Sequence, residues 1–245
     1  MLPLFLRSEG SWRTRFLALH AARGSLIAFA TLFFFSGLKY LPIADAISIF
    51  FIEPLLVTLL SAVLLGESVG WRRLTAIAIG FVGAMIIIRP GFEAFGWPVL
   101  LPVGTALCFS FYIILTRSLA QSEDPVRMQF FTGVFGCVVM SLALVTGAYM
   151  DIPVLASVWP DLTQWALLAG LGVIATTGHL LVVHAFRHAA VGVLAPFQYI
   201  EIVGATVLGY VIFNDFPDPA TWLGVSIIAA SGIYVFRRES QLSGQ

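Results

Sequence analysis

The sequence predicts an all-α integral membrane protein with eight transmembrane helices. Of its 245 residues, 59% are hydrophobic and only 11% are charged, whereas a soluble domain carries about 25% charged residues. The mean hydropathy is +0.96. Eight apolar segments alternate with short polar turns, and most approach the roughly 20 residues that cross a hydrocarbon core about 30 Å thick. Arginine and lysine gather in alternate turns, which is typical of a multi-pass membrane protein.

The predicted spans follow one another with little chain between them. The turn GESVGWRR separates the second and third spans, and QSEDPVR leads to the fifth. Asp45 is expected to cap the second helix, and Asp218 with Pro219 to start the eighth, since these residue types favour helix N-termini. The spans are predicted at residues 21–38, 45–65, 71–88, 97–117, 128–148, 165–183, 191–213 and 221–236.

The basic residues predict the orientation of these spans. With the N-terminus in the cytoplasm, the outer segments hold only Lys39 and Arg89. An odd number of spans would break this asymmetry, so both termini are predicted to be cytoplasmic, in a bacterial-type inner (plasma) membrane. The other eleven of the 13 basic residues fall on the inner side: Arg7, Arg13, Arg15, Arg23, Arg72, Arg73, Arg117, Arg127, Arg187, Arg237 and Arg238.

Several function classes are disfavoured by composition and motifs. The formal net charge is zero, so no nucleic-acid partner is expected. Cys108 and Cys137 lie far apart in apolar runs and predict neither a disulfide framework nor a metal site. His179 and His184 are five residues apart and form a poor metal pair. No GxGxxG, Walker, GxSxG or HExxH sequence occurs, so no cofactor and no catalytic residues are expected, and a membrane enzyme is the less favoured alternative.

An internal repeat emerges when the chain is shifted by 148 residues. Glu53 then aligns with Glu201, and Glu67 with Asp215. The alignment covers three spans in each half. Because the second span runs inward and the seventh outward, the two copies are predicted to be inverted. Inverted repeats are typical of secondary transporters, whose substrate site lies near the bilayer midplane between the repeats.

The two copies also suggest a family. The first reads GLKYLPIADAISIFFIEPLLVTLLSAVLLGESVGWRR and the second APFQYIEIVGATVLGYVIFNDFPDPATWLG. Both resemble the EamA domain of the drug/metabolite transporter superfamily, as does the run ending in YIILTR at Arg117. This resemblance implies two five-span repeats and transport of small metabolites such as amino acids, S-adenosylmethionine, riboflavin or sugars.

Compared with that ten-span pattern, the chain begins at what would be the third span. The expected organisation is therefore an incomplete first repeat over residues 1–90 with three spans, a complete second repeat over 97–238, and a cytoplasmic tail over 239–245. We expect a secondary transporter that moves a small polar metabolite by alternating access, without ATP. A truncated, non-transporting membrane protein or subunit is the alternative.

Glu53 and Glu201 are the leading candidates for a transport site. Each lies well inside a predicted span, where an acid costs about 2.5–3.5 kcal/mol on insertion scales, and they occupy equivalent repeat positions. Pro54 follows Glu53 and Pro196 precedes Glu201, so each acid lies near a predicted helix break. A buried carboxylate suits proton exchange or a cationic substrate group. The alternative is a structural carboxylate hydrogen-bonded between helices.

On the seventh span, Phe197, Gln198 and Glu201 share a face by i, i+3 and i+4 spacing. Gly204 continues this face and would allow another backbone to approach. An aromatic ring, an amide and an acid on one face indicate a place for a polar metabolite. Ordinary helix packing is the competing interpretation.

His179 and Tyr112 complete the candidate site residues. His179 lies mid-span in TTGHLLVVH, where a histidine indicates either function or an interhelical hydrogen bond. Tyr112 is a candidate cavity residue, although aromatic side chains are also common on lipid-exposed helices. Small residues on the third and eighth spans predict close helix packing or a homodimer contact: Ala76, Gly80, Gly83, Ala84, Gly224 and Ala229.

Overall fold

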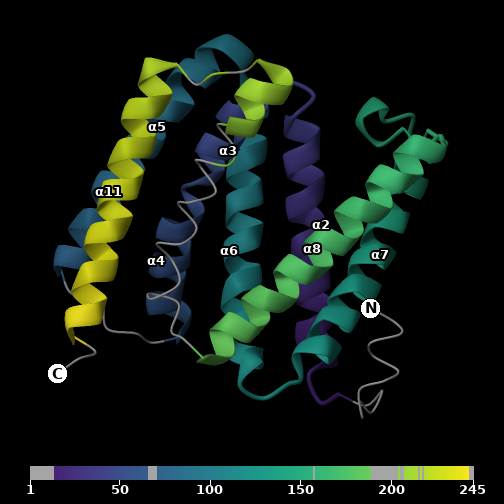
Figure 1. Cartoon of the computed structure of the whole chain (residues 1–245), viewed down its shortest axis with the longest axis horizontal. Helices are drawn as coiled ribbons and strands as arrows, with labels where there is room; N and C mark the ends of the chain where they lie inside the picture. The colour runs from purple at the N-terminus through teal and green to yellow at the C-terminus, as the bar shows by residue number, and fades with distance from the viewer. Residues whose placement is uncertain are drawn as a thin grey trace. The chain divides into compact units, whose positions relative to one another are not determined.

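The computed structural model describes residues 14–65, 71–156, 158–188, 204, 207–214, 216 and 218–242 (Figure 1). Within these ranges all regular secondary structure is helical, with no strand. The α-helices are α2 (Leu17–Gly37), α3 (Ile43–Phe50), α4 (Glu53–Leu65), α5 (Trp71–Phe95), α6 (Leu100–Ala120), α7 (Pro125–Tyr149), α8 (Leu162–His188) and α11 (Pro219–Leu242). Three short elements are η1 (Trp97–Val99), η2 (Pro153–Leu155) and the π-helix η3 (Gly209–Phe213).

These helices confirm the predicted class of an all-α membrane protein. Seven of the eight predicted spans coincide with described helices, and most of the seventh, 191–213, lies outside the described residues. Five helical segments are long and apolar enough to cross a bilayer, and α5 and α11 contain shorter apolar stretches. The five are Leu17–Gly37, Asp45–Leu64, Trp97–Ala120, Pro125–Tyr149 and Leu162–His188.

Aspartate side chains begin two of the longest helices. Asp124 accepts hydrogen bonds from the backbone N–H groups of Val126 and Arg127, at 3.0 and 3.1 Å. Asp161 accepts from the Gln164 N–H at 2.7 Å, while the Gln164 side chain accepts from the Asp161 N–H at 3.0 Å. This reciprocal pair is a capping box. Local side-chain chemistry therefore sets where α7 and α8 start.

Helix starts were predicted at Asp218 and at Asp45, and the structure confirms the first but not the second. Asp218 accepts from the Thr221 N–H at 2.6 Å, and α11 begins at Pro219 as predicted. The predicted cap at Asp45 is wrong, because α3 already begins at Ile43. Asp45 lies instead in the first turn, where its charge is favourable to the helix dipole.

The chain forms two compact units that are discontinuous in sequence. Unit 1 comprises Met1–Ala28 and Leu115–His188, and unit 2 comprises Phe29–Ile114 and Ala189–Gln245. The division therefore falls within α2 and within α6. Packing units need not coincide with sequence repeats, and the repeat boundaries at 1–90 and 97–238 remain a prediction.

In unit 2, glycines bring α5 and α11 side by side (Figure 1). A Cβ added at Gly83 would lie 2.9 Å from the Gly224 carbonyl oxygen, and one added at Gly224 would lie 2.6 Å from the Gly83 carbonyl oxygen. A Cβ at Gly80 would lie 2.6 Å from the Ser231 hydroxyl. These predicted small residues therefore serve close helix packing within the chain.

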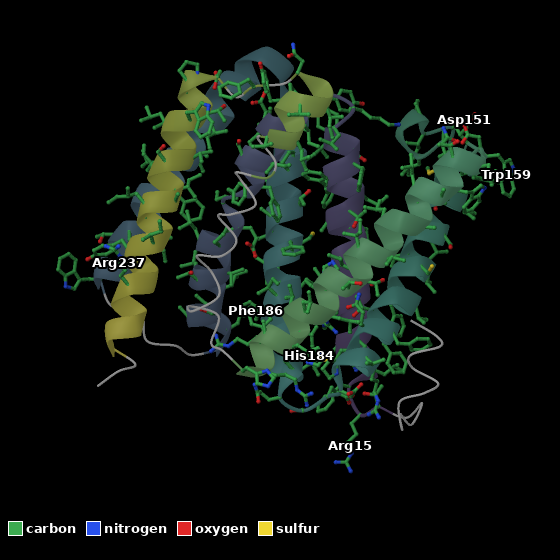
Figure 2. The ribbon with its side chains drawn as sticks, viewed as in Figure 1. Arg15, Asp151, Trp159, His184, Phe186 and Arg237 are labelled. Carbon is green, nitrogen blue, oxygen red and sulfur yellow. The ribbon has the colours of Figure 1, made fainter. Side chains whose placement is uncertain are left out.

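In unit 1, α7 and α8 pack together and are joined by a loop that contains η2. Asp151 and Trp159 lie at this loop, at the opposite end of α8 from His184 and Phe186 (Figure 2). At that other end, the Gln121 amide donates to the carbonyl oxygens of Phe186 and Arg187, at 3.3 and 3.2 Å. The turn after α6 thus satisfies carbonyl groups that the C-terminus of α8 leaves without helical donors.

Candidate functional site

The structure places four of the predicted site residues. Glu53, Pro54 and Tyr112 belong to unit 2, and His179 belongs to unit 1. The face predicted on the seventh span lies outside the described residues: Pro196, Phe197, Gln198 and Glu201. The first-copy residues of unit 2 and the polar residues of unit 1 are therefore described separately.

The second span is interrupted immediately before Glu53. Phe51 and Ile52 separate α3 from α4, and the Ile52 carbonyl oxygen accepts from two N–H groups of the next turn, at 3.1 Å each. Pro54 is the second residue of α4 and has no N–H to donate to the preceding turn. Two short helices in one span place Glu53 at a helix start rather than in a helix interior.

Glu53 is buried in the apolar core of unit 2, with 1% of its surface exposed. The Ser110 hydroxyl of α6 lies 2.7 Å from the Ala106 carbonyl oxygen and 3.3 Å from that of Glu53. This shared contact ties the interruption to α6. The surrounding core comprises Leu41, Ala46, Ile49, Phe51, Ile52, Leu55, Ile77, Ala84, Ile87, Val99, Ala106, Val225 and Ile228. Such surroundings strongly disfavour an uncompensated charge.

Tyr112 lies in the same unit as Glu53 and is completely buried. The Phe109 ring lies 5.6 Å from the Tyr112 ring and 5.6 Å from the Phe50 ring of α3. These aromatic side chains join α3 to α6 next to the interrupted span. The burial of Tyr112 places it inside unit 2 rather than on its surface.

His179 lies on α8 in unit 1 and is partly buried. Arg23 of α2 is a charged residue that acts on it electrostatically. The structure therefore associates His179 with a polar group on the first predicted span, which the sequence analysis did not single out.

Arg23 was predicted among the basic residues of the cytoplasmic side, which stays a prediction, and the structure shows this residue buried inside a helix. Helix α2 begins at Leu17, and Arg23 is completely buried within it. Its Nε donates to the Thr116 hydroxyl oxygen at 3.1 Å, and its Nη1 donates to the Met128 carbonyl oxygen at 3.3 Å. These acceptors allow a permanently charged guanidinium to be buried.

One helical turn before Arg23, His20 is also completely buried. Its ring stacks on Phe131 of α7, with centroids 5.2 Å apart and planes inclined by 25°. Among the residues that the structure describes, neither His20 ring nitrogen has a hydrogen-bond partner. Each buried polar atom without a hydrogen-bond partner destabilises the folded state by about 1–3 kcal/mol. The sequence HAAR could have indicated this buried pair, because the i and i+3 spacing of its His and Arg places both polar residues on one face of an apolar helix.

Glu123 is a further buried polar residue of unit 1. Its carboxylate accepts from the Thr14 hydroxyl at 2.9 Å and from the Arg127 guanidinium at 3.3 Å. Glu123 is 6% exposed. The ion pair places complementary charges next to the α6–α7 turn, and the Thr14 hydrogen bond connects the chain before α2 to that turn.

Helices α2 and α7 approach closely at Gly24, directly after Arg23. A Cβ at this position would lie 2.9 Å from the Thr132 carbonyl oxygen and 3.0 Å from the Gly136 backbone nitrogen. Only glycine allows this approach without displacement of backbone. The close contact lies beside the buried His20 and Arg23 side chains.

Comparisons with known proteins agree with the helical architecture. The model of the EamA-like transporter family matches residues 1–89 and 96–237. An S-adenosylmethionine uptake transporter of Rickettsia bellii (strain RML369-C) is 31% identical over 91% of this chain and 73% of its own length. A riboflavin transporter of Vibrio cholerae serotype O1 is 29% identical over 99% of this chain and 80% of its own length.

A solved structure supports the fold alone. A protein known from a crystal structure superimposes with a TM-score of 0.65 at 21% identity, over 94% of this chain and 81% of the other. The family match covers nearly the whole chain, and the named relatives are transporters rather than enzymes. The chain is a multi-pass membrane protein that belongs to the EamA-like transporter family.

Proposed function

We propose that this protein is a secondary transporter that moves a small polar metabolite of the S-adenosylmethionine or riboflavin class across the inner membrane. The relatives named for these two substrates support the cargo class. The observation that carries the proposal is the burial of Glu53 at an interrupted span. Broken helices and intramembrane carboxylates are typical of transporter sites.

The proposed mechanism is alternating access between two inverted repeats, one over residues 1–90 and the other over 97–238. Glu53 and Glu201 occupy matching positions in these repeats. One role for the carboxylates is proton exchange. The other is attraction of a cationic cargo group, such as the sulfonium of S-adenosylmethionine. Gln198 and Phe197 would then contribute polar and aromatic contacts beside Glu201.

The proposed orientation has both termini in the cytoplasm. Within unit 1, Arg15 and His184 lie toward one end, and Asp151 and Trp159 lie toward the other (Figure 2). Trp159 is 89% exposed, and tryptophan is enriched at membrane interfaces. This separation supports an arginine-rich cytoplasmic end and an outer end at the α7–α8 loop.

Uptake into proteoliposomes tests the function directly. Liposomes containing the purified chain are expected to accumulate labelled S-adenosylmethionine or labelled riboflavin, and empty liposomes are not. Counterflow against unlabelled cargo separates transport from adsorption, because only a carrier exchanges cargo across the bilayer. Failure of both substrates in uptake and counterflow would favour the alternative of a non-transporting membrane subunit.

A further inference from the structure

The His20 side chain has hydrogen-bonding capacity that the described fold does not use. It is completely buried, and neither Nδ1 nor Nε2 has a hydrogen-bond partner within the described ranges of the chain. Its neighbour Arg23 is engaged by the Thr116 hydroxyl and the Met128 carbonyl. Phe131 covers a face of the imidazole without satisfying its nitrogen atoms. The unused groups therefore lie along the edge of the ring.

The hydrogen-bonding groups at the edge of the His20 ring define which ligand group would pair with them. A neutral imidazole presents one N–H donor and one nitrogen acceptor in the plane of its ring. A complementary group must offer an acceptor and a donor and must also fit beside a stacked aromatic pair. Planar nitrogen heterocycles satisfy both conditions, because their edges carry N–H and ring-nitrogen or carbonyl groups while their faces stack on aromatic rings.

We propose that His20 and Phe131 form a subsite between α2 and α7 for a planar nitrogen heterocycle of the cargo. This rests on the proposed function for the identity of the cargo, since S-adenosylmethionine and riboflavin both contain such a ring system. The subsite is closed in the structure, since His20 is completely buried and α2 lies close against α7 at Gly24. Cargo reaches it when these helices separate during alternating access, and the ligand then supplies the partners that His20 lacks.

Equilibrium binding to the purified full chain tests the subsite independently of transport. The probes are adenosine and riboflavin, which carry the heterocycle, and methionine, which lacks it. We expect adenosine and riboflavin to bind more tightly than methionine. The variant His20→Phe keeps an aromatic ring against Phe131 but removes both polar edge atoms, so binding of the two heterocycles should weaken about tenfold. His20→Gln retains a donor and an acceptor and should recover part of this loss.

His184→Phe is the matched control, because it makes the same substitution at an exposed histidine of α8. Its affinities for the three probes should equal those of the wild type. Thermal unfolding separates binding from structure. His20→Phe removes buried atoms that lack partners, so its melting temperature should rise while its affinity for heterocycles falls.

Three outcomes would contradict the subsite, and a fourth would contradict only the transport function. Wild-type protein that binds neither adenosine nor riboflavin would overturn it, as would unchanged affinity in His20→Phe. If His20→Phe lowers both melting temperature and affinity and His20→Gln restores neither, His20 is structural and the proposal is wrong. Heterocycle binding that depends on His20, without uptake of either cargo, would support the subsite and reject the proposed transport function.

Discussion

Arg23 and Thr116 join two helices across 93 positions of sequence, through a hydrogen bond of 3.1 Å from the guanidinium Nε to the hydroxyl oxygen. Both side chains are completely buried. The bond lies within unit 1 and connects the first described helix to the end of α6. A fixed positive charge in an apolar helix is therefore held by neutral oxygen atoms of neighbouring helices.

Replacing Thr116 with valine should destabilise the protein by about 1.5–3 kcal/mol, since hydrogen bonds to charged groups contribute this much. The valine keeps the shape of threonine but leaves the Arg23 Nε without this acceptor. Thr177→Val is the control, because the Thr177 hydroxyl is exposed and bonds to the Val173 carbonyl of its own helix, at 2.8 Å. Thermal unfolding in detergent compares the two, and equal melting temperatures would contradict a stabilising role for the Arg23–Thr116 bond.

Gly83→Ala should destabilise unit 2, because the added methyl group would meet the Gly224 carbonyl oxygen at 2.9 Å. Overpacking of this kind typically costs about 1–3 kcal/mol. Gly170→Ala is the matched control on α8, where a Cβ meets nothing within 4 Å. Alanine at that helical position should be neutral or stabilising by up to about 1 kcal/mol. The midpoint of chemical unfolding measures both, and similar shifts would show that the α5–α11 contact does not require glycine.

Glu53→Gln should abolish accumulation driven by an imposed proton gradient while leaving cargo exchange in place, if Glu53 titrates during transport. Glutamine keeps the size and hydrogen-bonding capacity of the side chain but cannot exchange a proton at neutral pH. Glu201→Gln should have the same effect if both repeats take part in proton exchange. The measurement is uptake into proteoliposomes with and without the gradient.

Asp151→Asn is the control for the loss of a carboxylate in these variants. It also removes a carboxylate, but from an exposed loop position with a φ of 50° that asparagine tolerates. Its gradient-driven uptake should match that of the wild type. If Glu53→Gln, Glu201→Gln and the double variant all retain full gradient-driven uptake, the two carboxylates are structural.

The proposed topology predicts opposite locations for two reporters. One fused after Arg238 should be cytoplasmic, and one inserted near Ala156, in the α7–α8 loop, should be periplasmic. Enzymatic reporters that are active in only one compartment measure this. Two reporters on the same side would show that the number of spans between them is not odd.

The sequence by itself determined the features that depend on local chemistry. Apolar length predicted the spans because a bilayer sets a minimum run of apolar residues. Asp218 and Pro219 predicted the start of α11 because capping acts within one turn. Small residues such as Gly83 and Gly224 predicted close packing because the lack of a side chain is itself the cause of the approach.

Only the tertiary structure decided which polar side chains are buried together. Arg23 was predicted on the cytoplasmic side because basic residues near a span end normally lie there. Its burial depends on Thr116 and on the Met128 carbonyl, which the fold brings from distant parts of the chain. His20 likewise became a candidate only when α7 placed Phe131 against it. Helical spacing shows which residues share a face, but the acceptors and rings that meet that face come from long-range packing.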